Sequence, residues 1–233
     1  MAFKLPASLI GRFGEHPKAV SIVGFGRSVY EFPASGAEMV WSINDASRVH
    51  WYIGPDMVVA MDDWKRDVRI DPKYVEFISS LGVPVCGTKA YKQWPCLFAY
   101  PVKEVVGMLG RPWLDNTCSY ALALAIYLGI KEINLYGFDF WTRDTAGAIY
   151  DATEVAKEKY GKVPAWFAYY MSACTERRRL MEPGGECVSY LIGFARGRGL
   201  KVNVPAGTAL MDLDREQYLY GYERQPDFLL GKK

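Results

Sequence analysis

The sequence predicts an α/β fold built around one doubly wound, mostly parallel sheet. Short apolar runs alternate along the chain with segments of helical character, which is the order expected of βαβ units. Those apolar runs that lack an alternation of hydrophobic and polar residues are expected to be covered on both faces, which indicates a parallel sheet between helix layers. With 233 residues, half of them hydrophobic, the chain is long enough for one such domain over 1–233.

Six strands and six helices are predicted in chain order. The strands are 19–24, 38–43, 56–61, 83–86, 132–137 and 201–204. The helices are 27–33, 72–81, 117–129, 152–160, 164–181 and 186–199.

The helix over 117–129 has the clearest boundaries. Asp115, Asn116 and Thr117 offer side-chain oxygens that can cap its first turn. The following "SYALALAIYL" is apolar on almost every side, and Gly129 is a typical residue just past a helix end. We therefore expect a central, buried helix whose N-terminus carries free N–H groups and a positive partial charge.

Residues 141–185 differ in composition from the rest of the chain. The segment is richer in polar, charged and aromatic residues, and it lies between the predicted strands 132–137 and 201–204. We interpret it as a helical insertion or lid over the ligand crevice and not as a second domain.

Composition excludes several classes of protein. A net charge of +2 excludes a nucleic-acid binder that acts by bulk charge, although local patches such as Arg177–Arg179 stay open to phosphate or nucleic-acid contact. Five cysteines without a CxxC pair, beside two histidines, favour free thiols over a disulfide framework or a zinc cage. The absence of a long apolar run predicts a cytoplasmic protein without a membrane span.

The first predicted strand ends in a glycine-containing turn. Gly24, Gly26, Arg27 and Ser28 follow the run "VSIV", so the backbone can approach a ligand closely and Arg27 and Ser28 can donate to a phosphate. Val29 stands where a dinucleotide fingerprint has its third glycine, which leaves NAD as a weak alternative and a plain turn as another. The sequence has no P-loop.

Further polar residues stand at other strand ends. Asn44 and Asp45 follow the second strand and suit a ribose or a base edge, with an Asx-turn as the alternative. Gly137 and Asp139 follow the strand 132–137. Ligands of open α/β sheets bind beyond the carboxyl ends of the strands, so these residues are predicted to converge with Asn116 and Thr117.

Asp62 and Asp63 follow the third strand. Paired carboxylates can bind Mg²⁺ or act as a base, and the equally weighted alternative is a solvated helix cap.

Residues 116–140, "NTCSYALALAIYLGIKEINLYGFDF", resemble a segment of bacterial lipooligosaccharide sialyltransferases, with a polar tripeptide, an apolar helix, a strand and Gly-x-Asp-Phe. "VGFGRSVYEF" and "WSIND" are similar to that family's first two strand ends. The order and spacing also resemble a wider Rossmann-like set, the 6-hydroxymethylpterin pyrophosphokinase-like proteins. The resemblance covers 19–63 and 115–140, less than half the chain.

The sialyltransferase resemblance implies a CMP-sugar donor and no required metal. It implies that the first turn and Asn44 hold the nucleotide, and that Asn116-Thr117-Cys118 lies beside the donor phosphate. The chain departs from the family in having Asn-Thr-Cys for Thr-Ser-Gly, and in lacking a late histidine as general base. Glu182 and Glu186 stand at the comparable place.

The expected function is therefore a nucleotide-sugar-dependent glycosyltransferase whose base is Asp139, Glu182 or Glu186. The acceptor hydroxyl belongs to a glycan, a small molecule or a hydroxymethylated DNA base. A pterin-type pyrophosphokinase is the first alternative, with ATP and with Mg²⁺ on Asp62, Asp63 and Asp139. A non-catalytic nucleotide-binding module is the second.

Overall fold

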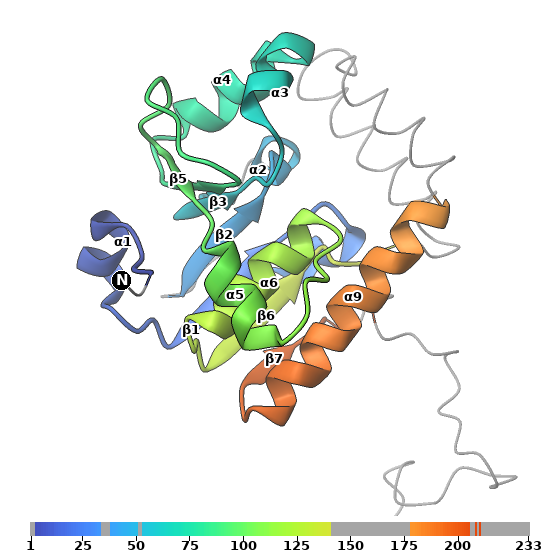
Figure 1. Cartoon of the computed structure of the whole chain (residues 1–233). Coiled ribbons are helices and arrows are strands. Elements are labelled where there is room, and N and C mark those ends of the chain that lie inside the picture. The colour runs from blue at the N-terminus through green and yellow to red at the C-terminus, as the bar shows by residue number, and fades with distance from the viewer. Residues whose placement is uncertain are drawn as a thin grey trace, which may run out of the picture.

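A single open sheet of seven strands forms the centre of the protein (Figure 1). This computed structural model describes residues 3–33, 38–50, 53–140, 178–205, 208 and 210. All neighbouring strands are parallel, and their order is β5-β4-β3-β2-β1-β6-β7. The predicted α/β fold with a parallel sheet is confirmed.

The strands are β1 (Ala19–Val23), β2 (Met39–Ile43), β3 (Met57–Val59), β4 (Val85–Gly87), β5 (Leu97–Ala99), β6 (Glu132–Tyr136) and β7 (Lys201–Asn203). The helices are α1 (Ala7–Phe13), α2 (Ala46–Val49), α3 (Trp64–Ile70), α4 (Pro72–Ser80), α5 (Val102–Leu109), α6 (Thr117–Tyr127) and α9 (Arg178–Gly197), with a short 3₁₀ helix η1 (Arg27–Glu31).

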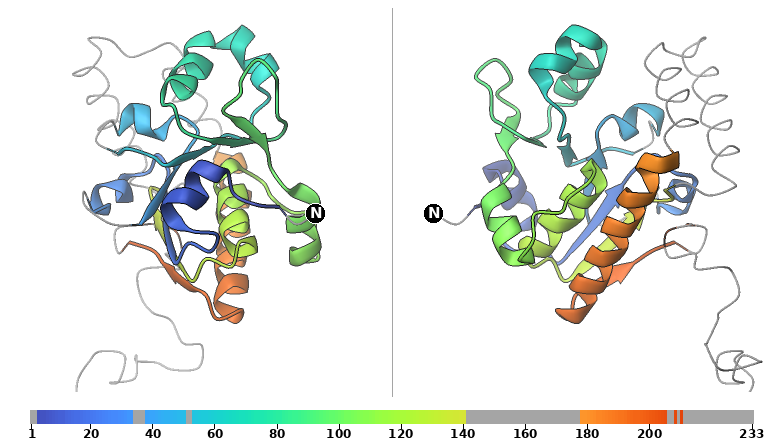
Figure 2. Two further views of the ribbon diagram at one scale, coloured as in Figure 1. Left: turned by 90° about the vertical axis from the view of Figure 1, so that its left-hand side faces the viewer. Right: turned by 45° about the vertical axis from the view of Figure 1, so that its right-hand side comes forward.

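Helices α5, α6 and α9 lie side by side along the sheet in Figures 1 and 2. Helix α6 contacts β1, β2 and β3, and it also packs against α5 and α9. Its residues 121–126 are all buried, which matches the prediction of a central apolar helix. Within the described ranges, no helix is both long and apolar enough to cross a bilayer.

The main hydrophobic core takes alternate residues of the strands. Val20 and Ile22 of β1 and Ile133 and Leu135 of β6 join this core together with α6 and α9. Such alternation follows from the period of two along a strand.

The intervening residues carry a polar ladder. Glu38 Oε2 accepts hydrogen bonds from Ser21 Oγ and Asn134 Nδ2, each at 2.8 Å. Asn203 Nδ2 donates to Asn134 Oδ1 at 2.6 Å and to Glu132 Oε1 at 2.8 Å. The ladder links the start of β2 with β1, β6 and β7, so a one-residue slip of any of these strands would leave polar groups unpaired.

Several elements were not predicted. Strand β5 and helices α1, α3 and α5 are short, and each draws its stability from packing and not from a strong local pattern. The predicted break between helices 164–181 and 186–199 is wrong, because α9 continues through Pro183-Gly184-Gly185. The predicted helix 152–160 and most of the predicted insertion 141–185 lie outside the described residues.

Candidate functional site

The carboxyl ends of β1 and β6 meet where the strand order reverses. The chain builds the sheet outward from β1 to β5, returns, and places β6 on the other side of β1. In open α/β sheets such a switch point opens a crevice at the carboxyl ends of the strands. The candidate site is therefore expected at these two strand ends.

Two glycines bring the strand ends into direct contact. Gly24 N donates to Tyr136 O at 2.8 Å, and Gly26 N donates to Gly137 O at 2.9 Å. A Cβ on Gly24 would lie 2.6 Å from the Gly137 carbonyl oxygen, closer than any real Cβ contact. Gly137 also has φ of +71°, so both positions require glycine.

Ser28 and Asp139 fasten the turn after β1 to the end of β6. Ser28 N donates to Asp139 Oδ2 at 2.6 Å, and Gly137 N donates to Ser28 Oγ at 2.9 Å. The Ser28 amide, predicted to donate to a phosphate, is therefore used by Asp139. Asp139 Oδ1 is buried and has no hydrogen-bond partner among the described residues.

The end of β2 adds a second set of polar groups. Asn44 has φ of +48°, a left-handed conformation that asparagine tolerates better than most residues. Its Oδ1 is buried and has no hydrogen-bond partner within the described residues. Asn44 thus presents a side-chain acceptor at the carboxyl edge of the sheet.

Asp45 is a buried acid, 4% exposed. Burial raises the pKa of its carboxyl from 3.8 to about 6, and the positive charge of Arg48, 3.7 Å away, opposes that rise. Asp45 is thus close to titration near neutral pH, unlike an exposed aspartate.

His50 is a residue of this region that the sequence did not single out. It is buried, and burial lowers the pKa of its imidazole from 6.5 to about 4, with a hydrogen bond to the Phe25 backbone opposing the shift. Its ring lies edge-on to that of Tyr30 in η1, at a centroid distance of 6.2 Å. His50 therefore joins the end of α2 to the turn after β1 as a neutral side chain.

The N-terminus of α6 faces the same edge. Asn116 caps the helix, with Oδ1 accepting from Ser119 N at 2.9 Å and Asn116 N donating to Ser119 Oγ at 3.2 Å. The N–H groups of Thr117 and Cys118 have no acceptor among the described residues. Burial raises the pKa of the Cys118 thiol to about 12, so this group is no thiolate nucleophile at neutral pH.

Helix α9 closes the site on one side. Gly184 packs against the Asn116 side-chain amide, and a Cβ there would overlap that amide and lie 3.3 Å from the Phe140 ring. Phe140 has φ of +33°, which is rare for a large side chain. Both contacts place the start of α6 beside the end of β6.

The three predicted bases occupy different positions. Glu186 is exposed on α9, two residues after the Gly184 contact. Asp139 is tied to Ser28, as described above. Glu182 lies within α9, and its side chain is outside the described part of the chain. Arg27 opens η1 directly after Gly26.

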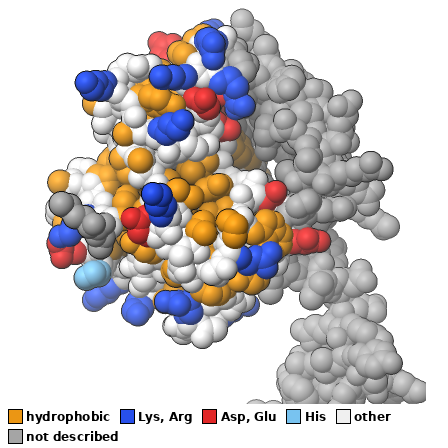
Figure 3. All heavy atoms as spheres, viewed as in Figure 1, with side chains coloured by type: hydrophobic (Ala, Val, Ile, Leu, Met, Phe, Trp, Pro, Cys, Tyr) orange, Lys and Arg blue, Asp and Glu red, His pale blue; other side chains and the backbone are white. Residues whose placement is uncertain are grey.

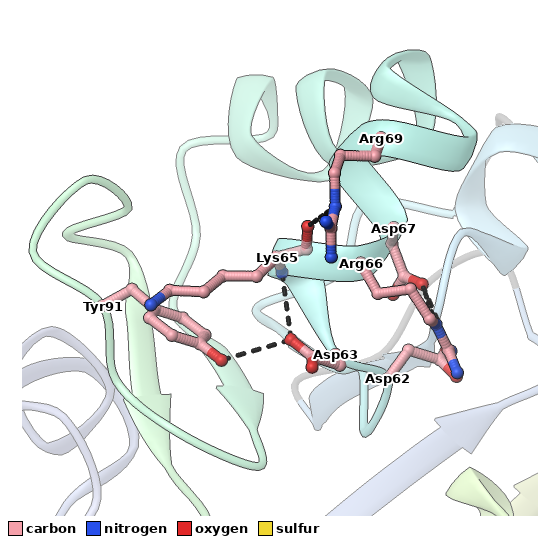
Figure 4. A network of polar contacts seen from close by, with 7 residues as sticks. All are labelled: Asp62, Asp63, Lys65, Arg66, Asp67, Arg69 and Tyr91. Atoms are coloured by element: carbon pink, nitrogen blue, oxygen red, sulfur yellow. Dashed lines mark hydrogen bonds and ion pairs between the residues drawn. The ribbon is translucent and has the colours of Figure 1, made fainter.

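Asp62 and Asp63 at the end of β3 belong to a network of surface charges (Figure 4). Asp63 caps α3 by accepting from Lys65 N at 3.1 Å, and it also accepts from the Tyr91 hydroxyl at 3.3 Å. Asp62 lies 4.0 Å from Arg66. The helix-cap interpretation of Asp63 is the one the structure adopts.

No metal centre emerges from the described residues. They contain no group of three or more histidine, cysteine or acidic side chains arranged to hold a metal ion. The described cysteines 86, 96, 118 and 187 are free thiols.

Comparison with known proteins finds distant similarities among solved structures only. No family model matches the chain, and no curated protein matches it. The sialyltransferase CstII from Campylobacter jejuni, in complex with the substrate analogue cytidine-5'-monophosphate, aligns with a TM-score of 0.49 at 17% identity, over 85% of this chain and 84% of that chain. CstII in complex with CMP-3FNeuAc aligns with a TM-score of 0.39 at 16% identity, over 62% of this chain and 77% of that chain. At these values neither similarity by itself assigns a function.

Proposed function

We propose that this protein is a glycosyltransferase that takes its sugar from a nucleotide donor. The observation that carries the proposal is the contact between Gly24 and Gly137 at the switch point of the sheet. It brings bare backbone of two strand ends together at the place where a nucleotide lies in open α/β folds. The resemblance of residues 116–140 to bacterial sialyltransferases implies a CMP-sugar as the donor.

The nucleotide would be held from two sides. The Asn44 side-chain oxygen suits a ribose hydroxyl or an amino group of the base, because it is an acceptor without a partner among the described residues. The amides of Thr117 and Cys118 suit the donor phosphate, because a helix N-terminus favours negative charge.

The transfer step follows from these positions. The acceptor hydroxyl oxygen attacks the anomeric carbon of the sugar, and the bond from that carbon to the phosphate oxygen breaks. The nucleoside phosphate leaves with the bonding electrons, and the amides at the α6 N-terminus stabilise its negative charge. The hydroxyl proton passes to a carboxylate, for which we propose Glu186, an exposed residue of α9 two positions after the Gly184 contact.

Donor binding is tested by a thermal-shift panel of CMP-, UDP- and GDP-sugars, ATP and NAD, each with and without Mg²⁺. A ligand that binds only the folded state raises the melting temperature. We expect a shift with a nucleotide-sugar in the absence of Mg²⁺. A shift confined to ATP with Mg²⁺ would favour the pyrophosphokinase, and no shift with any compound would contradict the proposal.

The role of Asn44 can be tested with a variant that removes its side chain and keeps its backbone conformation. Asn44→Gly removes the side-chain acceptor and keeps the left-handed backbone, since glycine adopts positive φ readily. The variant should fold with normal stability and lose most of the donor-induced shift. An unchanged shift would remove Asn44 from the site.

The identity of the general base is tested by comparing the turnover rate of Glu186→Gln with that of Asp139→Asn. Loss of a general base costs about 10²–10⁴-fold in rate, so Glu186→Gln should fall in that range. Asp139→Asn keeps an oxygen that can accept from Ser28 N and should cost far less. The reverse ranking would make Asp139 the base. Binding with no turnover on any acceptor would favour the non-catalytic module.

A further inference from the structure

A track of aromatic rings and cations runs from the candidate site along α9. Trp113 and Tyr190 have ring centroids 6.1 Å apart, and Tyr190 and Phe194 have centroids 6.3 Å apart. The guanidinium carbon of Arg111 lies 4.5 Å from the Trp113 centroid and 5.1 Å from that of Tyr190. That of Arg198 lies 5.5 Å from the Phe194 centroid. We call these five residues the α9 track.

One end of the track touches the site. Cys187 Sγ donates to Trp113 O at 3.3 Å, which fixes the loop before α6 against the middle of α9. Tyr190 lies one helical turn beyond Glu186, the proposed base. Tyr190 and Phe194 then repeat at a spacing of four residues, so they share one face of the helix.

The other end of the track reaches an edge of the sheet that carries three lysines, of which Lys201 is paired with Glu132 at 2.6 Å. Lys18, Lys131 and Lys201 are exposed at the starts of β1, β6 and β7. Backbone hydrogen bonds from Lys201 N to Lys131 O and from Glu132 N to Lys18 O place the three lysines in adjacent strands. In Figure 3, Lys and Arg side chains gather along the lower edge of this view, below hydrophobic side chains in the middle of the same face.

The charge of the track is one-sided. From Cys187 to Pro205 the sequence has no acidic residue, while Arg196, Arg198 and Lys201 are basic. Glu186 stands at the site end. A partner lying along α9 would therefore meet no acidic residue of this segment over the roughly 16 Å from Cys187 to Arg198, and positive charge at the far end.

We propose that the α9 track binds a single-stranded nucleic acid and leads it into the candidate site. This inference rests on the proposed function, and it names the strand as the bearer of the acceptor hydroxyl. Exposed guanidinium groups stacked on rings offer flat faces on which bases stack, and their edges donate to phosphates. Proteins that bind single-stranded nucleic acid without sequence preference combine positive charge, which attracts the phosphates, with aromatic rings on which the bases stack.

An acidic oligosaccharide is the competing occupant. It would pair with Arg111 and Arg198 through its carboxylates or phosphates. A nucleic acid would use these cations for its phosphates and also the aromatic rings, whose centroids lie 6.1 and 6.3 Å apart, for its bases. The combination of rings and cations therefore favours nucleobases.

The test measures fluorescence anisotropy of a labelled single-stranded oligonucleotide with the full chain, over a series of salt concentrations. Arg111→Glu with Arg198→Glu removes both stacked cations. Lys73→Glu with Lys89→Glu is the matched control, because it makes the same charge change at two exposed lysines outside the α9 track. Lys73 lies in α4, and Lys89 follows β4. We expect the first pair to weaken binding at least tenfold and to reduce the salt slope by about 1.4, at about 0.7 for each lost phosphate contact. The control pair should have a much smaller effect.

Ring stacking is tested separately by Tyr190→Leu and Phe194→Leu, which keep an apolar side chain against the core. Each should weaken oligonucleotide binding by about tenfold. Equal losses in both charge pairs, or ring variants that bind as the wild type does, would overturn the inference. Tighter binding of a sulfated or phosphorylated oligosaccharide than of the oligonucleotide would overturn it too.

Failure of this inference is distinguishable from failure of the proposed function. The Arg111→Glu, Arg198→Glu variant keeps the glycine contact and the α6 N-terminus, so its thermal shift with the nucleotide-sugar should stay normal. A normal donor shift with no oligonucleotide binding would refute the track alone.

Discussion

Asp45 and His50 are both buried. Their pKa shifts predict opposite pH dependences of the unfolding free energy, which nearly cancel in the wild type. Burial raises the pKa of Asp45 to about 6 and lowers the pKa of His50 to about 4. Each shift exceeds two pH units, which corresponds to about 3 kcal/mol of unfolding free energy. Substituting one residue at a time should therefore expose the contribution of the other.

The signs follow from proton binding in the two states. Between about pH 4 and 6 the unfolded chain has lost the Asp45 proton while the folded protein retains it, so stability falls as pH rises. Between about pH 4 and 6.5 the unfolded chain holds a His50 proton that the folded protein lacks, so stability rises as pH rises. Above pH 7 neither group changes further.

The assay is urea unfolding of wild type, Asp45→Asn and His50→Gln from pH 4 to pH 7. The unfolding free energy of Asp45→Asn minus that of wild type should increase by about 3 kcal/mol over this range. The same difference for His50→Gln should decrease by about 3 kcal/mol. Differences that stay constant with pH would show that neither group is shifted, and the double variant should lose both slopes.

Three further predictions concern single contacts, and unfolding free energy measures each. Gly24→Ala should cost about 1–3 kcal/mol because its Cβ would overlap the neighbouring strand end, while Gly54→Ala, with open space around it, should stay within about 0.5 kcal/mol of wild type. Asn116→Ala should cost about 1 kcal/mol through loss of the α6 cap. Asn134→Leu should cost about 1–3 kcal/mol for each polar group of the ladder left unpaired, and a fully stable variant would show that the ladder is dispensable.

Local signals predicted most of the sheet. Strands β1, β2, β3 and β4 each contain a compact apolar run, while β6 and β7 alternate apolar with polar residues. Both patterns stay recognisable without tertiary context. Strand β5 has three residues between Cys96 and Tyr100, which is too short for a pattern. The break predicted before Glu186 was wrong because Gly184 is used for its small size against Asn116 and not as a helix stop.

The parts of the candidate site were less evenly predictable. The glycines after β1 and β6 could be found, because a strand followed by glycine and a polar residue is a local pattern. His50 could not be found, since one histidine after a short helix carries no periodic signal. The burial that lowers the pKa of its imidazole exists only in the folded protein, where the hydrogen bond to the Phe25 backbone opposes that shift.

Asp139 shows how a pairing across the fold changes the interpretation of a motif. From the sequence, Gly26, Arg27 and Ser28 form a turn with donors for a phosphate. In the folded protein, the Ser28 amide donates a hydrogen bond to the carboxylate of Asp139, which lies 111 residues further along the chain. The turn after β1 therefore already holds an anionic group, and a donor phosphate there would meet like charge. The amides of Thr117 and Cys118 carry no such carboxylate among the described residues. For the proposed donor we therefore expect the phosphate at the α6 N-terminus and the nucleoside beside the backbone of the turn after β1.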